Sequence, residues 1–309
     1  MRILLHRADG LTDPWVRDFV QVLPRAEVVV WREGEQIAPC DYAVLWCPPE
    51  ELLGQLAQVK AIFLTGAGAD AILKYGPALP QVPIIRLGDA GMAVQMAEYV
   101  THAVLRYFRR FGEYEQQARH GVWAPLPQYD KSDFTIGVLG MGVLGTPVLD
   151  ALAQFGFPLR GWSRTPKQHA RASCYAGREQ FDDFLAGTRV LVCMLPLTAE
   201  TDNLLGRAAL SKLPRGAYLI NVARGAHVAE PDLLELIGSG HIAGATLDVF
   251  RTEPLPAHHP FWSEPRITLT PHISALTLRL ESIRQIGAKI RALENGESVS
   301  DVVDRNRGY

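Results

Sequence analysis

Three glycines that join an apolar strand to a helical segment constrain this chain most. They are Gly140, Gly142 and Gly145, spaced as G-x-G-x-x-G in "FTIGVLGMGVLGTPVLDALAQFG". The spacing alone is weak evidence, but a preceding strand and a following helix are the context that a dinucleotide-phosphate loop requires. Gly140 permits the tight turn, Gly142 leaves room for a pyrophosphate, and Gly145 lets helix and strand pack closely. The bland alternative is a tight turn that binds no ligand.

Short apolar strands alternate with helical segments along the whole chain, which predicts parallel strands connected by crossover helices. The predicted strands of the first series are residues 2–6, 26–31, 42–47, 60–65 and 82–87. Those of the second series are residues 134–139, 158–162, 188–194, 217–222, 242–247 and 267–270.

A break between the two series predicts two domains. A helix is expected over residues 91–120, followed by a proline-rich connector at 123–133. A second helix, at about 275–294, is expected to return to the first domain. We therefore predict an α/β protein with two doubly wound parallel sheets. A flavodoxin-like substrate domain would comprise residues 1–98 and 276–309, and a Rossmann cofactor domain would comprise residues 99–275.

Bulk composition excludes several classes of partner and location. The net charge of −2 favours neither nucleic acid nor an anionic membrane. No apolar run approaches the roughly 18 residues of a membrane span, and the N-terminus lacks the apolar region of a secretory signal. Cys40, Cys47, Cys174 and Cys193 show no paired spacing, so we expect buried free thiols in a reducing cytoplasm.

The strand after the glycine motif ends without the carboxylate that usually binds the adenosine ribose. Ser163, Arg164, Thr165 and Lys167 stand there instead. A guanidinium and a hydroxyl can bind a 2′-phosphate, which a carboxylate would repel. The segment therefore predicts NADPH in preference to NADH, and the alternative is a solvated basic loop.

Polar side chains follow three later strands of the second series. Arg224 ends "YLINVAR", Asp248 and Glu253 lie in "LDVFRTEPLP", and His272 lies in "TPHIS". Ligands of open α/β sheets bind at the carboxyl ends of strands. An arginine can clamp a substrate carboxylate, a histidine can pass a proton to a carbonyl oxygen, and a glutamate can orient that histidine. Taken singly, each is more often a surface charge or a loop residue; together they predict a reductase site.

No metal site is expected. His258 and His259 are adjacent, but no cysteine or carboxylate stands at ligand spacing. We expect both histidines to be solvated.

Several of these segments resemble one enzyme family over essentially the whole chain. "GVLGMGVLG", "MLPLTAETDNLL", "INVARGAHV", "LDVFRTEPLP", "TPHIS" and "VVDRNRGY" resemble the D-isomer-specific 2-hydroxyacid dehydrogenases. "YAVLWCPPEELL", "FLTGAGADAIL" and the final "RGY" are similar to its glyoxylate/hydroxypyruvate reductase A group. The resemblance implies NADPH-dependent reduction of glyoxylate or hydroxypyruvate to glycolate or glycerate, by a cytoplasmic homodimer joined through helices like that at 91–120.

The resemblance also assigns substrate-site roles. His272 would be the acid/base and Glu253 its partner, while Arg224 would bind the substrate's carboxylate and carbonyl. The backbone N–H groups of Ala67 and Gly68 would hold the carboxylate, and Trp46 would shape the pocket.

For the cofactor, the resemblance places Asp248 at the nicotinamide end. The residues expected to bind the cofactor are Gly140, Met141, Gly142, Val143, Leu144, Gly145, Ser163, Arg164, Thr165, Lys167, Leu195, Pro196, Thr201, Val222, Ala223 and Asp248.

Three questions stay open at this stage. Many relatives carry an acidic residue where this chain has Ser163, which bears on cofactor choice. Arg279 could reach a substrate or be a surface charge of its helix. The function could also be a broader 2-keto acid reductase, or a dinucleotide-sensing binding protein with little turnover, although the intact set of Arg224, Glu253 and His272 argues against the latter.

Overall fold

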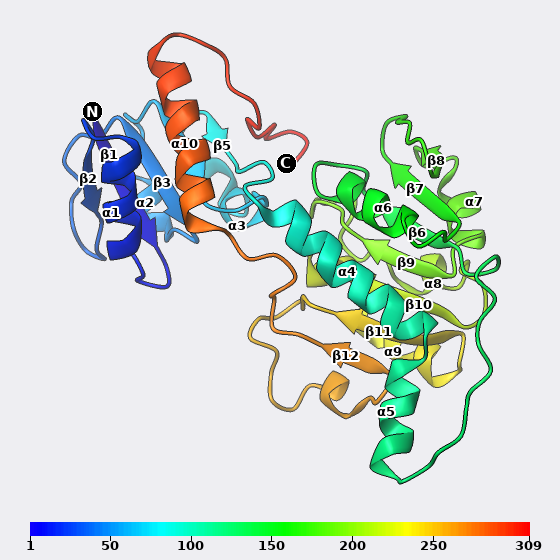
Figure 1. Cartoon of the computed structure of the whole chain (residues 1–309). Helices are drawn as coiled ribbons and strands as arrows, with labels where there is room; N and C mark the ends of the chain where they lie inside the picture. Colours follow the sequence, from blue (N-terminus) through cyan, green and yellow to red (C-terminus); the bar gives the residue numbers. More distant parts are fainter. The chain divides into compact units, whose positions relative to one another are not determined.

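The computed structural model describes residues 1–309 and is drawn in Figure 1. Its contacts divide the chain into a first unit, Met1–Gly91 with Thr277–Tyr309, and a second unit, Met92–Leu276. The predicted domain boundary after residue 98 falls inside a helix that belongs to the second unit. The two divisions differ there because this helix is continuous from Met92, and the predicted domain bounds otherwise stay a prediction.

The first unit is built on a parallel sheet in the order β2-β1-β3-β4-β5. Its strands are β1 (Arg2–Arg7), β2 (Glu27–Val30), β3 (Tyr42–Trp46), β4 (Ala61–Leu64) and β5 (Ile84–Ile85). This is the strand order of flavodoxin-like folds, whose ligands bind where the order reverses, between β1 and β3.

Helices cover the sheet of the first unit. They are α1 (Asp13–Val22), α2 (Glu50–Leu53), α3 (Asp70–Leu73), the 3₁₀ turn η1 (Gly76–Ala78) and α10 (Arg279–Glu294). α1 begins with an aspartate and a proline, which favour a helix start, and it buries Trp15 and Phe19 four residues apart. α10 comes from the end of the chain and packs against α1, so the first unit is discontinuous in sequence (Figure 1).

The second unit contains a larger parallel sheet in the order β12-β11-β10-β9-β6-β7-β8. Its strands are β6 (Ile136–Leu139), β7 (Leu159–Ser163), β8 (Ser173–Ala176), β9 (Val190–Cys193), β10 (Ala217–Asn221), β11 (Ile242–Leu247) and β12 (Ile267–Leu269). The order reverses at β6, as in dinucleotide-binding sheets. The predicted fold class is thus confirmed. Only β8 was missed, because "SCYA" is short and has no apolar run.

Two hydrophobic cores fill the two faces of this sheet. α4 (Met92–Phe108) and α6 (Gly145–Ala153) contribute to one core; α4 does so through Met96, Val100 and Val104, spaced for one helix face. The helices contributing to the other core are α7 (Phe181–Ala186), α8 (Arg207–Leu210) and α9 (Glu230–Gly238). The 3₁₀ turns η2 (Gly225–His227) and η3 (Pro260–Ser263) lie in loops after β10 and β11.

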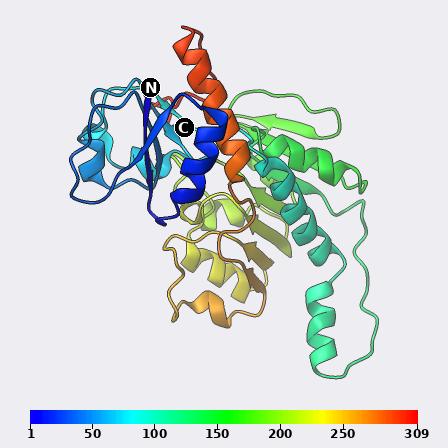
Figure 2. The same cartoon turned by 60° about the vertical axis from the view of Figure 1, so that its left-hand side comes forward.

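The predicted helix over 91–120 is interrupted. α4 ends at Phe108 and α5 (Phe111–Arg119) begins after Arg110, whose backbone is left-handed with φ 58°. The apolar spacing continues across the break, which is why the sequence did not reveal it. α5 buries no residue, and it projects with the following segment away from the sheet of its own unit (Figures 1 and 2).

Two smaller expectations are corrected. Cys40 and Cys193 are buried free thiols, but Cys47 is exposed and Cys174 is half-buried. His259 is not solvated, since its Nδ1 accepts a hydrogen bond from the backbone of Phe261 and its Nε2 lies 3.2 Å from Oε2 of Glu230.

None of the helices combines the length and apolar character that crossing a membrane would take.

Candidate active site

The carboxyl ends of three adjacent strands bring the candidate catalytic residues together. β10, β11 and β12 are neighbours in the sheet. Arg224 follows β10, Glu253 lies in the loop after β11, and His272 follows β12. An arginine, a carboxylate and a histidine therefore lie in adjoining loops at one edge of the sheet.

His272 and Glu253 form a direct pair. Nδ1 of His272 lies 2.7 Å from Oε2 of Glu253, and the side chains are 45% and 35% exposed. A carboxylate only accepts hydrogen bonds, so Nδ1 carries the hydrogen and Nε2 is the ring atom left for a substrate.

The second oxygen of Glu253 is fixed by the backbone, because the N–H of Phe250 donates to Oε1 (2.9 Å). Burial alone would raise the pKa of Glu253. The hydrogen bonds from His272 and Phe250, with the charges of His272 and Arg224, outweigh burial and hold this pKa below its ordinary value. Glu253 is thus a charged partner for the ring.

A glycine brings the Arg224 segment against the Glu253 segment. A Cβ on Gly225 would lie 1.8 Å from the carbonyl carbon of Phe250, so only glycine fits there. The side chain of Asn221 donates to the carbonyl of Arg224 (2.9 Å), which fixes the turn. This close approach explains why the charge of Arg224 acts on Glu253.

His227 is a residue of this region that the sequence reasoning missed. It is fully buried; its Nδ1 lies 2.9 Å from the carbonyl oxygen of Arg224, and its Nε2 lies 3.3 Å from the carbonyl oxygen of Pro196. Burial would lower its pKa, but Cys193 and the carbonyls of Pro196 and Arg224 raise the pKa of His227 to about 9. Its only sequence signal was its place in "ARGAHV".

Asp248 directly follows β11 and is fully buried. Its carboxylate accepts hydrogen bonds from the N–H groups of Ile273 and Ser274, both at 2.8 Å, and its carbonyl accepts from the N–H of His272 (2.8 Å). These hydrogen bonds tie Asp248 to the loop that carries His272.

The glycine loop has the geometry that a dinucleotide needs. Gly140 has φ 109°, and a Cβ on it would lie 2.7 Å from the carbonyl oxygen of Met194. A Cβ on Gly145 would lie 1.8 Å from the carbonyl oxygen of Gly140, which explains the close helix packing. Nothing lies within 4 Å of the equivalent position on Gly142. The loop is thus tight where it must pack and open where a pyrophosphate would approach.

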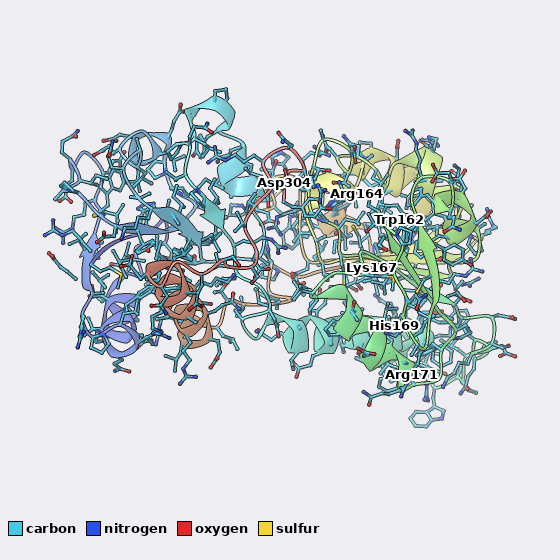
Figure 3. All side chains as sticks on the ribbon, turned by 90° about the horizontal axis from the view of Figure 1, so that it is seen from above. Trp162, Arg164, Lys167, His169, Arg171 and Asp304 are labelled. Carbon is cyan, nitrogen blue, oxygen red and sulfur yellow. The ribbon has the colours of Figure 1, made fainter.

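Basic side chains follow β7 beside this loop. Nζ of Lys167 donates to the carbonyl oxygen of Met141 (2.5 Å), which places a cation at the glycine loop. Ser163 is buried and its hydroxyl donates to the carbonyl of Thr165 (2.8 Å), while Arg164 is exposed. Figure 3 shows Arg164 and Lys167 in succession along this segment. These cations, with no carboxylate at the strand end, suit a 2′-phosphate.

His169, which the sequence reasoning also passed over, ties the basic segment to α6. Its Nδ1 accepts from the N–H of Arg171, and its Nε2 lies 3.2 Å from Oδ1 of Asp150. α6 is the helix whose N-terminus follows the glycine loop, so both cofactor segments are joined to one element.

The loop after β9 lies beside the glycine loop, because β9 and β6 are neighbours. Thr201 closes it, since its hydroxyl donates to the carbonyl of Pro196 (2.8 Å) and accepts from the N–H of Thr198 (2.8 Å). The remaining predicted cofactor residues around these loops are Leu195, Val222 and Ala223, which are buried, Leu144, which is half-buried, and Val143, which is exposed.

In the first unit the predicted substrate residues also lie at strand ends. Trp46 ends β3, and its ring lies against the guanidinium of Arg7 at the end of β1 (4.9 Å). Ala67 and Gly68 lie in the loop after β4, where Nη1 of Arg86 donates to the carbonyl of Ala67 (3.3 Å). Trp46, Ala67 and Gly68 thus share the carboxyl edge of the sheet of the first unit.

Arg279 is a surface charge of α10 in this unit. Its Nε lies 2.7 Å from Oδ2 of Asp18 on α1.

Comparison with known proteins identifies the family. The model of the D-isomer specific 2-hydroxyacid dehydrogenase NAD binding domain matches residues 101–274. The glyoxylate/hydroxypyruvate reductase A of Yersinia enterocolitica is 46% identical over 314 residues, with 100% of both chains covered. A D-isomer specific 2-hydroxyacid dehydrogenase of Xanthobacter autotrophicus Py2, solved with NADPH and MES, has a TM-score of 0.95 and 38% identity, covering 100% of this chain and 99% of its own.

An NADPH-dependent glyoxylate/hydroxypyruvate reductase of Sinorhizobium meliloti, solved with NADP and sulfate, has a TM-score of 0.92 and 32% identity. The match covers 100% of this chain and 99% of that one. With its glycine loop and its Arg224, Glu253 and His272 at successive strand ends, the chain belongs to the D-isomer specific 2-hydroxyacid dehydrogenase family.

Proposed function

We propose that this protein reduces glyoxylate, hydroxypyruvate or both to the corresponding 2-hydroxy acids, with NADPH as the hydride donor. The observation that carries the proposal is the His272–Glu253 pair, with Arg224 in the adjoining loop. The names of the relatives from Yersinia enterocolitica and Sinorhizobium meliloti support the substrate class.

NADPH fits the residues of the second unit. The open position at Gly142 leaves room for a pyrophosphate, and the N-terminus of α6 offers N–H groups to it. Lys167 and Arg164 supply positive charge where a 2′-phosphate would lie, and Ser163 supplies no repelling carboxylate. Solved relatives hold NADPH or NADP. Bound NADPH would supply the hydride that adds to the carbonyl carbon.

The side chains of this chain would supply the rest of the chemistry. Arg224 would hold the keto acid's carboxylate in a planar two-point contact and draw charge from its carbonyl. Nε2 of His272, in its protonated form, would donate a proton to the carbonyl oxygen as negative charge develops there. Glu253 would stabilise that protonated ring and fix its orientation through Nδ1. The overall reaction adds one hydride and one proton to the carbonyl group of the keto acid.

The first unit would contribute to substrate choice. We propose that the backbone N–H groups of Ala67 and Gly68 bind the carboxylate and that Trp46 bounds the side-chain pocket. A tryptophan ring in that place would favour small substrates such as glyoxylate over keto acids with large side chains.

A panel of 2-keto acids tests the function. We expect NADPH oxidation, followed by its absorbance, to be fastest with glyoxylate or hydroxypyruvate and much slower with pyruvate and larger keto acids. NADPH binding without turnover of any of them would contradict the proposal and favour a cofactor-sensing protein.

We further propose that the protein is a homodimer. α5 buries none of its residues, and Phe111, Val122 and Trp123 are 47%, 49% and 100% exposed. Apolar side chains gathered on a projecting segment are typical of a subunit interface. Light scattering should give twice the chain mass of 34.1 kDa, and Trp123→Asp should weaken the dimer; a wild-type monomer would contradict this.

The cytoplasm is our proposed location. All four cysteines are free, which suits a reducing compartment, and NADPH is a cofactor of intracellular reductions.

A further inference from the structure

A line of hydrogen bonds runs from α4 to the loop that carries His272. The hydroxyl oxygen of Tyr99 lies 2.5 Å from Oγ1 of Thr270. The hydroxyl of Thr270 lies 2.5 Å from Oδ1 of Asp248. Tyr99 is on α4, Thr270 directly follows β12, and Asp248 directly follows β11, so three separate parts of the chain meet here.

The direction of these hydrogen bonds follows from their chemistry. A carboxylate accepts and does not donate, so Thr270 gives its single hydroxyl hydrogen to Asp248. Tyr99 must then donate its own hydrogen to Oγ1 of Thr270. Burial raises the pKa of Tyr99 to about 12, so the phenol keeps that hydrogen at neutral pH.

Asp248 in turn binds the backbone of His272 and of the two residues that follow it. Its Oδ1 and Oδ2 accept from the N–H groups of Ile273 and Ser274, and its carbonyl accepts from the N–H of His272. Asp248 is 0% exposed, so water does not compete for these bonds. Three consecutive N–H groups are thus held by one residue.

The backbone of His272 needs such a hold. Its φ is 56°, in the left-handed region that side chains other than glycine rarely adopt. A residue stays there only where its surroundings fix it, and such residues gather at functional sites. This backbone conformation belongs to the loop that places Nδ1 of His272 beside Glu253.

We propose that Tyr99 and Thr270 are positioning residues for His272, acting through Asp248. The proposal rests on the proposed function, because it takes His272 as the acid. It also gives Asp248 a role in holding the His272 loop, beside the contact with the nicotinamide end that the family resemblance implies.

Three substitutions remove or restore the interaction. Tyr99→Phe deletes the first donor, Thr270→Val deletes the second hydroxyl while keeping its shape, and Thr270→Ser restores that hydroxyl. Tyr218→Phe is the matched control, since Tyr218 is a buried tyrosine of the same unit whose hydroxyl lies 3.0 Å from that of Thr246 instead.

With NADPH and glyoxylate, Tyr99→Phe and Thr270→Val should lower kcat roughly five- to fiftyfold, as expected when a lost hydrogen bond misplaces a catalytic group. Their KM for NADPH should stay within about twofold of wild type. Thr270→Ser and Tyr218→Phe should keep most of the activity. In a His272→Ala background, Tyr99→Phe should cost nothing further, because the two changes act through one group.

A second measurement does not depend on turnover. In protein labelled with ¹⁵N-histidine, the ring resonances of His272, assigned from their loss in His272→Ala, should shift in Tyr99→Phe and Thr270→Val but not in Tyr218→Phe. If wild type binds NADPH but turns over no keto acid, the proposed function fails, and these resonances still decide the positioning role.

Three results would each overturn the proposal. They are a wild-type kcat in both variants, a loss of kcat from Tyr99→Phe that is as large in the His272→Ala background as in wild type, and ring resonances of His272 that do not move.

Discussion

Nδ1 of His272 lies 2.7 Å from Oε2 of Glu253, although the two side chains come from loops that follow different strands. The pair leaves Nε2 as the ring atom that can face a substrate. The ring and Arg224 lie in loops at the same edge of the sheet. The expected effects of changing these residues follow from this arrangement.

Removing the ring of His272 should remove the chemistry and spare cofactor binding. His272→Ala should lower kcat for glyoxylate reduction by about 10²–10⁴-fold, the usual contribution of general acid catalysis. The Kd for NADPH, measured by fluorescence, should change little. His258→Ala, which alters an exposed histidine of the same unit, is the control. Turnover near wild type in His272→Ala would refute the assignment.

Glu253→Gln should move the pH dependence of the reaction. The amide keeps the size of the side chain but removes the negative charge beside the ring, so the protonated ring is less favoured. The activity of the variant in glyoxylate reduction should therefore fall off at a lower pH than that of wild type. Steady-state kcat measured between pH 5 and 9 checks this, and superimposable profiles would show that the charge plays no part.

The same carboxylate should also affect stability in a defined pH range. The pKa of Glu253 lies below its ordinary value of 4.5 in the folded protein, so its charged form is favoured by folding. That stabilisation is present above the unfolded pKa and is lost as the pH falls through the lower folded pKa. The Tm difference between wild type and Glu253→Gln should thus shrink as the pH is lowered below about 4.5. Glu200→Gln, at an exposed position, should show no comparable trend.

Arg224→Lys should bind substrate poorly despite keeping its charge. An ammonium group cannot reproduce the planar two-point contact of a guanidinium with a carboxylate. Hydrogen bonds to charged groups contribute about 1.5–3 kcal/mol, and each 1.4 kcal/mol is tenfold. We expect kcat/KM for glyoxylate to fall by roughly ten- to a hundredfold, mostly through KM, with NADPH affinity retained. Wild-type values of both constants would exclude Arg224 as the clamp.

Cofactor preference should follow the segment after β7. Wild type should favour NADPH over NADH by roughly ten- to a hundredfold in kcat/KM, since one or two charge-assisted hydrogen bonds are involved. Arg164→Ala and Lys167→Ala should weaken NADPH selectively, and Ser163→Asp should reverse the order by repelling the 2′-phosphate. Lys212→Ala, which removes a cation paired with Asp182 on the same unit, is the charge control. A wild-type protein that uses NADH as well as NADPH would show that these cations are only a solvated loop.

Much of this site could be predicted because strands can be recognised in the sequence by their apolar runs. The carboxyl ends of neighbouring parallel strands then lie at one edge of the sheet. That reasoning placed Arg224, Glu253 and His272 in adjoining loops. It could not reveal the left-handed backbone of His272 or the buried position of His227, because both depend on contacts between distant segments. The break at Arg110 was hidden for a different reason, since helical apolar spacing continued through it.

Tyr99 illustrates the limit most clearly. Its spacing marks it as one residue of a helix, and nothing local indicates that its hydroxyl meets Thr270, 171 positions further on. β8 was missed because its residues are mostly half-exposed and carry no apolar run. Local pattern thus predicts elements and edges, while the side chains that support a site are found only in three dimensions.

The order of strands in the second unit has an evolutionary consequence. β7, which precedes the basic segment, is separated from β10, which precedes Arg224, by β6 and β9. At about 4.8 Å per strand, that is roughly 14 Å, beyond the range of about 7–10 Å in which substitutions usually couple. Substitutions at Ser163 and its neighbours could therefore change the preferred nicotinamide cofactor during evolution without altering proton transfer at His272. Adaptation to a new redox pool and adaptation to a new keto acid would then be separate, additive steps.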